Sequence, residues 1–156
     1  MDGHLALDAK FFDLPLEEKQ KLDSKNEDLT RGYETMAAQV LDEGWPPDLK
    51  EGYMSSVDAD ENHRYTKLKV PGTGRNQWPE TMPEFKVQYE AYVDHALDLG
   101  RHLARMLALS LELDEEYFDE CLKEPLHYGR ILKYPPHPQD AAQTSWARAR
   151  IPIGGC

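Results

Sequence analysis

The fold is decided by the stretch Thr81-Met-Pro-Glu-Phe-Lys-Val-Gln-Tyr-Glu-Ala-Tyr-Val-Asp-His-Ala-Leu-Asp-Leu-Gly-Arg-His-Leu-Ala-Arg-Met-Leu-Ala-Leu-Ser-Leu111. Its apolar residues recur at alternating spacings of four and three, the pattern of one face of a long helix. These residues are Phe85, Tyr89, Tyr92, Ala96, Leu99, Leu103 and Met106. Thr81 and Glu84 can form a capping box, and Pro83 suits the first turn. The pattern predicts a helix over 82–112. More apolar residues widen its stripe, so we expect the helix to be well buried.

Shorter elements are expected on both sides of this helix. The expected order is a short helix at 4–12, a second helix starting near Pro15, a turn at 31–33, a strand at 50–56, a long loop at 57–80, a short helix starting at Asp114, and a strand at 127–134. Pro135 and Pro136 end that last strand, because proline cannot donate to a sheet ladder. Gly100 interrupts the long helix and can mark a close contact or a slight bend.

The composition excludes several classes of partner. The chain has 156 residues, a net charge of −11, a pI near 4.9 and a mean hydropathy of −0.73. Such an acidic chain is a poor match for nucleic acid or an anionic membrane surface. No apolar run approaches membrane-spanning length, and no signal peptide is visible. Cys121 and Cys156 make no disulfide framework, so a reduced, cytoplasmic compartment is the expectation.

Four blocks of sequence carry a resemblance to a known family. They are Phe11-Phe-Asp-Leu-Pro-Leu-Glu-Glu-Lys19, Arg31-Gly-Tyr33 with Lys50-Glu-Gly-Tyr53, Gly74-Arg-Asn-Gln-Trp-Pro-Glu80, and Leu109 to Phe118 leading to Arg130-Ile-Leu-Lys-Tyr-Pro-Pro136. In this order and spacing, the chain resembles the isopenicillin N synthase-like oxygenases that depend on 2-oxoglutarate and Fe(II). The resemblance implies an α+β, mainly helical fold with an incomplete double-stranded β-helix.

The same resemblance implies a division of the chain. Residues 1–125 correspond to the non-haem dioxygenase N-terminal region without its first strand, and residues 126–138 to the first part of the oxygenase barrel. Residues 139–156 fit neither part and are interpreted as an aberrant tail. We therefore expect a slice of a longer enzyme that lacks both the opening strand and most of the barrel.

The family's chemistry implies an Fe(II) ion held by two histidines and one carboxylate, with open positions for 2-oxoglutarate and O₂. A small molecule is the implied substrate. None of the six histidines of this chain is followed by Asp or Glu two positions later. We therefore predict no metal ligand and no bound cofactor for this chain as written, and an inactive product.

Two residues match the family's cofactor-binding positions. The resemblance implies that Tyr134 contacts 2-oxoglutarate from the barrel wall, and that Arg130 matches a recurrent arginine on the same strand. The alternatives are an aromatic packing on the core for Tyr134 and a structural ion pair for Arg130. Arg31 and Tyr33 either border the substrate mouth or form a simple turn.

The tail supports an interpretation as a shifted reading frame. If each codon starts on the third base of the one written, residues 145–156 are compatible with Leu-Gly-Ala-Gly-Ala-His-Thr-Asp-Trp-Gly, followed by Leu, Met or Val and then Leu. This peptide contains the His-x-Asp that the family places here. The hypothesis is that residues 139–156 arise from a frame or splice error.

A second hypothesis comes from another functional class. The chain could be a non-catalytic helical interaction module that uses the exposed face of the long helix. The edge of the strand at 127–134 is expected to be open, because the barrel is incomplete, and open edges invite self-association.

Overall fold

The computed structural model describes residues 2–27, 31–36 and 49–136. The tail predicted to be aberrant, 139–156, lies outside these residues. The helices are α1 (Asp2–Phe12), α2 (Leu16–Gln20), α3 (Arg64–Lys67) and α4 (Pro83–Ser110), with 3-10 helices η1 (Ser24–Glu27) and η2 (Glu120–Leu122). The strands are β1 (Gly32–Glu34), β2 (Glu51–Ser56) and β3 (Tyr128–Lys133). The predicted α+β, mainly helical fold is therefore confirmed.

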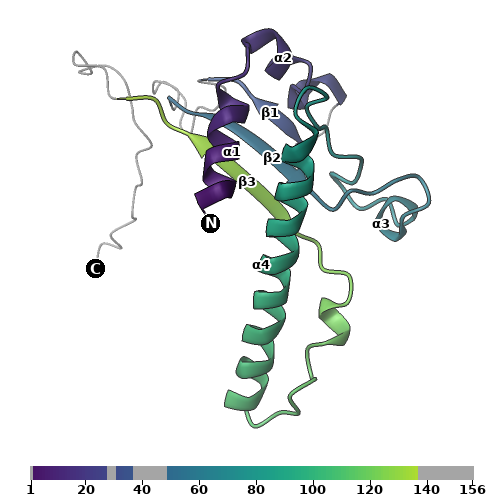
Figure 1. Cartoon of the computed structure of the whole chain (residues 1–156). Helices are drawn as coiled ribbons and strands as arrows, with labels where there is room; N and C mark the ends of the chain where they lie inside the picture. The colour runs from purple at the N-terminus through teal and green to yellow at the C-terminus, as the bar shows by residue number, and fades with distance from the viewer. Residues whose placement is uncertain (1, 28–30, 37–48, 137–156) are drawn as a thin grey trace, which may run out of the picture.

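The three strands form one antiparallel sheet in the order β1-β2-β3. Residues Ser56 and Tyr128 are partners at one end of the β2–β3 ladder, and Glu51 and Lys133 are partners at the other. Helices α1 and α4 lie over the same face of this sheet, and α4 continues well beyond it (Figure 1). Within the described residues, β3 is an edge strand.

The core lies between that face of the sheet and the two helices. It is mainly aromatic, because successive strand residues alternate between faces and the inward positions of β1 and β2 are tyrosines. Phe11 of α1 stacks on Phe85 of α4, with ring centroids 4.7 Å apart, and its edge meets Tyr53 of β2 at 5.1 Å. The buried cluster consists of Leu7, Phe11, Phe12, Leu22, Tyr33, Tyr53, Met82, Phe85 and Tyr89.

Helix α4 has the predicted length, but its cap and its burial differ from the prediction. Met82 precedes the first turn and makes no side-chain cap bond, so the capping box of Thr81 and Glu84 is wrong. Phe85 and Tyr89 are buried on the side of α4 that faces the sheet. The apolar residues after Tyr89 are mostly exposed. The prediction of a well-buried helix fails because the described sheet covers only its first half (Figure 1).

Two of the shorter predicted elements also differ. The segment at Asp114 forms turns with bonds such as Tyr117 N to Asp114 O, and a 3-10 helix begins only at Glu120. Asp119, just before this 3-10 helix, bonds to α4: Arg105 Nε donates to Asp119 Oδ1 at 3.1 Å. The loop predicted at 57–80 contains the four-residue helix α3.

Arg31 joins the start of the sheet to the loop after β2. Its side chain is 1% exposed. Nη1 donates to the carbonyl oxygen of Val57 at 2.7 Å and to that of Gly74, and Nη2 donates to that of Gly72 at 2.5 Å. Tyr33 is equally buried. Both residues are therefore structural, and the interpretation that they border a substrate mouth is wrong.

A second buried polar network ties α2 to the sheet. Lys19 Nζ donates to Glu51 Oε2 at 2.8 Å and to the carbonyl oxygen of Phe12 at 2.7 Å. The Tyr33 hydroxyl donates to the same carboxylate oxygen at 2.7 Å. Burial and this carboxylate together raise the pKa of Tyr33. Paired and hydrogen-bonded charges of this kind are the ones that folded interiors tolerate.

A buried carboxylate lies where α1 meets α4. Asp8 is 8% exposed, its Oδ1 has no partner among the described residues, and its Oδ2 lies 3.5 Å from His4 Nε2. Burial raises the pKa of Asp8, and the charge of His4 acts in the opposite direction. A raised pKa in the folded state means that stability is lost as the pH rises through that pKa.

We therefore expect Asp8→Asn to stabilise the chain at pH 7 by about 1 kcal/mol, because it removes a buried charge. The gain should shrink as the pH falls and Asp8 becomes protonated. Urea unfolding at several pH values measures it. The control is Asp13→Asn. Hydrogen bonding to Lys133 lowers the pKa of Asp13, so removing this carboxylate should not stabilise the chain. A less stable Asp8→Asn variant at pH 7 would show that the bond to His4 outweighs the burial cost.

Candidate functional site

Strand β3 presents two different faces. Gly129 points toward α4, since an added Cβ would collide with the Tyr89 hydroxyl, and Ile131 packs against the core. Because side chains alternate along a strand, Tyr128, Arg130 and Leu132 point to the opposite face. Tyr128 is 50% exposed and Leu132 39% exposed, so the described residues leave this face open.

Arg130 forms an ion pair on that open face. Its Nη2 meets Glu34 Oε2 of β1, across the middle strand. Gly52 of β2 makes room, since an added Cβ would come within 3.0 Å of that Glu34 oxygen and 3.1 Å of Leu132 Cδ2. The structural role that the sequence left open for Arg130 is thus present. Its role toward 2-oxoglutarate stays a prediction.

Tyr134 directly follows β3. It is 43% exposed and does not belong to the buried aromatic cluster, so the alternative that it packs on the core is wrong. The structure places it in the same strand segment as Arg130, and an extended backbone would carry both on one face. Its proposed contact with 2-oxoglutarate stays a prediction.

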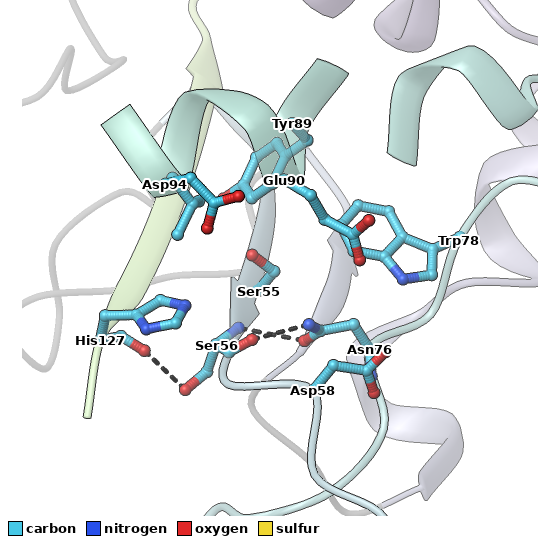
Figure 2. A pocket seen from close by; sticks show the side chains of 10 residues that line it. Ser55, Ser56, Asp58, Asn76, Trp78, Tyr89, Glu90, Asp94 and His127 are labelled. Carbon is cyan, nitrogen blue, oxygen red and sulfur yellow. Dashed lines mark hydrogen bonds between the residues drawn. The ribbon is translucent and has the colours of Figure 1, made fainter. Parts of the chain in front are cut away.

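A cavity of about 280 Å³ lies under α4, on the other side of the sheet (Figure 2). Its lining comes from the end of β2, the following loop, α4 and the residue before β3. The lining residues are Ser55, Ser56, Asp58, Asn76, Trp78, Tyr89, Glu90, Val93, Asp94 and His127. This volume lies just below the range of about 300–1,000 Å³ that is typical of small-molecule pockets.

Hydrogen bonds fix the floor of this cavity. Asn76 pairs reciprocally with Ser56: Ser56 N donates to Asn76 Oδ1 at 3.0 Å, and Asn76 Nδ2 donates to the Ser56 carbonyl oxygen at 2.7 Å. Ser56 Oγ donates to the carbonyl oxygen of His127 at 2.7 Å (Figure 2). Burial raises the pKa of Tyr89, and its hydrogen bond with Ser55 acts in the opposite direction. These bonds tie β2, the loop and β3 together, which is a structural task.

The described residues do not fit an Fe(II) ion. They contain no group of three or more His, Cys, Asp or Glu residues placed to hold a metal. His95 and His102 each turn Nδ1 toward the carbonyl oxygen four residues earlier on α4, and both are exposed. His127 lines the cavity, and its Nδ1 is buried with no partner among the described residues. His137 lies outside the described residues.

Sequence reasoning missed two residues that organise this region. Asn76 lies in the block Gly74–Glu80 that carries part of the resemblance, but the sequence assigned it no role. Glu34 was not identified as a residue of interest. Asparagine pairing with a strand backbone has no periodic signal, because its partner Ser56 is 20 residues away. Only the sheet register reveals that Glu34 and Arg130 meet.

Comparison with known proteins identifies the family. Residues 1–81 match the model of the family described as the non-haem dioxygenase in morphine synthesis N-terminal region. The 2-oxoglutarate-Fe(II) type oxidoreductase hxnY of Emericella nidulans is 35% identical over 134 residues, which cover 84% of this chain and 38% of that protein.

Two solved structures resemble the chain. A 2OG-Fe(II) oxygenase family protein from Caulobacter crescentus has a TM-score of 0.75 at 26% identity, covering 91% of this chain and 45% of that chain. A Neurospora crassa protein, solved in complex with alpha-KG and 5-formyluracil, has a TM-score of 0.60 at 26% identity, covering 86% of this chain and 37% of that one.

The chain spans about two fifths of the length of the curated relatives it matches. The described part contains no helix long and apolar enough to cross a membrane. The family model covers more than half of the chain, and the solved structures share its partial fold. The chain therefore belongs to the non-haem, 2-oxoglutarate- and Fe(II)-dependent oxygenase family, of which it carries the N-terminal region.

Proposed function

We propose that the chain is the N-terminal part of an oxygenase that uses 2-oxoglutarate and Fe(II) to oxidise a small organic molecule. The observation that carries the proposal is the family match over residues 1–81, continued by a strand, β3, that ends in Tyr134-Pro-Pro. In this proposal the open face of β3 is part of the wall around the 2-oxoglutarate site. The compartment is proposed to be the cytoplasm.

Within that site, the residues of this chain bind and orient the 2-oxoglutarate and do not react with it. Tyr134 offers a phenol hydroxyl that can donate a hydrogen bond to a carboxylate. Arg130 offers a guanidinium that suits carboxylates, but Glu34 already engages it. We therefore assign the contact with the oxoacid to Tyr134 and a positioning role to Arg130. The iron, when bound in the intact protein, supplies the oxidation chemistry.

We further propose that the chain as printed does not turn over alone, because it has no His-x-Asp. The experiment compares it with a protein in which the frame is shifted from residue 145 onward and the following coding sequence is added. The longer protein should consume 2-oxoglutarate with Fe(II) and O₂. The printed chain should consume none and bind no stoichiometric Fe(II) in an anaerobic titration. One-to-one iron binding by the printed chain, lost on His127→Ala, contradicts the proposal.

The longer protein with the shifted frame also tests the proposed 2-oxoglutarate site. Tyr134→Phe should raise the KM for 2-oxoglutarate about fivefold, which corresponds to the loss of one hydrogen bond of about 1 kcal/mol. The matched control is Tyr117→Phe, an exposed tyrosine that lies outside β3. Equal effects of the two substitutions would remove Tyr134 from the site. If the downstream sequence encodes neither the distal histidine nor an oxoacid-binding arginine, the proposed function itself fails.

The second candidate is a non-catalytic interaction module. The observation that favours it is the exposed apolar surface of the second half of α4, where Leu99, Leu103 and Met106 are each more than half exposed. The two candidates differ in what coding sequence follows the printed chain, so the same experiment separates them.

A further inference from the structure

Helix α1 meets α4 through a stacked pair of rings. The imidazole of His4 lies nearly parallel to the Tyr92 ring of α4, with centroids 4.6 Å apart and an interplanar angle of 12°. Gly3 lies at the same junction, where an added Cβ would come within 3.3 Å of Gln88 Nε2. The position of the His4 ring therefore depends on α1 being docked against α4.

Asp8 brings a charge into the same junction, one turn further along α1. His4 Nε2 lies 3.5 Å from Asp8 Oδ2, and the two side chains are only 13% and 11% exposed. His4 Nδ1 and Asp8 Oδ1 are both buried with no partner among the described residues. Water therefore has little access to stabilise an uncompensated charge on either group.

The groups that face this pair from the other elements do not compensate a charge on Asp8. The tyrosines of α4 are neutral phenols, and the inward charges of the sheet are already paired, Glu51 with Lys19 and Lys133 with Asp13 at the other end of α1. The titratable groups in question are Tyr89 and Tyr92 from α4, Glu51 from β2 and Lys133 from β3. Among the described residues, His4 is therefore the cation that acts on Asp8.

We propose that His4 and Asp8 form a proton-controlled latch, a contact that holds α1 against α4 only while the pair carries a proton. With a proton, the pair is either an ion pair or a neutral acid beside a neutral ring. When the last proton leaves, Asp8 becomes a buried carboxylate without a cation, which is costly. Burial raises the pKa of Asp8, in the direction that the latch requires, and the charge of His4 acts in the opposite direction. The proposal does not depend on the proposed function.

The latch opens as the pH rises. A proton that the folded chain holds more tightly than the unfolded chain contributes stability at low pH, and this contribution is lost as the pH rises through its titration. Histidine changes charge between about pH 5 and 8, so the pair loses its last proton in this range. The apolar contacts of Leu7, Phe11 and Phe12 in the core do not titrate. We therefore expect α1 to loosen without unfolding of the whole chain.

Hydrogen–deuterium exchange of the whole chain, read out on the peptide that contains α1, tests the latch. After correction for the intrinsic exchange rate at each pH, the protection of α1 should fall about tenfold between about pH 6 and about pH 8, as one proton leaves. Asp8→Asn should abolish this fall, because an amide carries no charge. The control Asp13→Asn removes a carboxylate at the other end of α1 and should keep the fall.

His4→Phe separates the proton from the packing. Phenylalanine can stack on Tyr92 but carries no proton, so α1 should be less protected than in the native chain at about pH 6 and similarly protected at about pH 8. Its control is His95→Phe, because His95 is exposed on α4 and bonds to the backbone of Ala91. An NMR titration gives a second readout: the His4 ring should titrate at lower pH in Asp8→Asn than in the native chain, because the carboxylate that favours its charged form is gone.

Three results would overturn the latch. The first is a fall in α1 protection that is equal in the native chain and in Asp8→Asn. The second is a titration of the His4 ring that Asp8→Asn leaves unchanged, since the two groups then do not share a proton. The third is a His4→Phe variant that lowers α1 protection equally at every pH, because the histidine then acts through packing alone.

Discussion

Arg31→Met should destabilise the chain by about 3–5 kcal/mol, because it leaves three carbonyl oxygens without their donor, each at a cost of about 1–3 kcal/mol. Its guanidinium holds the carbonyl oxygens of Val57, Gly72 and Gly74, and methionine fills similar volume but donates nothing. The loop after β2 would then lose its attachment to the start of β1. Urea unfolding followed by tyrosine and tryptophan fluorescence measures the change.

The matched control is Arg75→Met in the same loop. Arg75 lies 3.6 Å from the carboxylate oxygens of Asp58 and Asp60, and its side chain is 64% exposed. Exposed pairs of this kind contribute about 0–1 kcal/mol. Equal losses for the two variants would mean that the arginines act through the chain's net charge and not through the buried carbonyls.

Lys19→Met is expected to cost about 3–5 kcal/mol, because it leaves the buried Glu51 carboxylate without its close cation. Lys133 cannot replace it fully, since its Nζ is 3.9 Å from the other carboxylate oxygen and is partly exposed. The double variant Lys19→Met with Glu51→Gln should recover part of the loss, because the uncompensated charge is gone.

Lys21→Met is the control for this second prediction, because Lys21 pairs with Glu18 at the surface, with its side chain 66% exposed. Its effect on stability should be small by comparison, because water screens an exposed ion pair. If the double variant is as unstable as Lys19→Met alone, the cost comes from the lost bond to the Phe12 carbonyl or from packing, and not from the buried charge.

The sequence was sufficient for elements whose signal is local. The spacing of apolar residues predicted α4 almost to its ends, and Pro135-Pro136 predicted where β3 stops. The resemblance extended this to the fold class and the family. Arg130 was predicted as a residue of interest, with the ion pair as one of its two possible roles.

The sequence was insufficient wherever two distant segments decide the outcome. Periodicity shows which side of α4 is apolar, but not that the described sheet ends beneath its first half (Figure 1). Likewise, the pairing of Glu34 with Arg130 joins residues 96 positions apart and depends on the register of three strands. Asn76, on the floor of the cavity, gave no signal because its bonds go to backbone atoms.

The pairing of β2 with β3 has a consequence for how the chain is made. Ser56 and Tyr128 are neighbours in the sheet, yet 72 residues separate them in the sequence, and α4 lies in between. At a synthesis rate of about 5–20 residues per second, β2 leaves the ribosome roughly 4–14 s before β3 can be added. During that interval one edge of β2 has no partner strand. Chaperones that bind nascent chains should therefore bind this protein after β2 has emerged and before β3 has emerged. They should release it once β3 has paired with β2 and Gly129 packs against Tyr89.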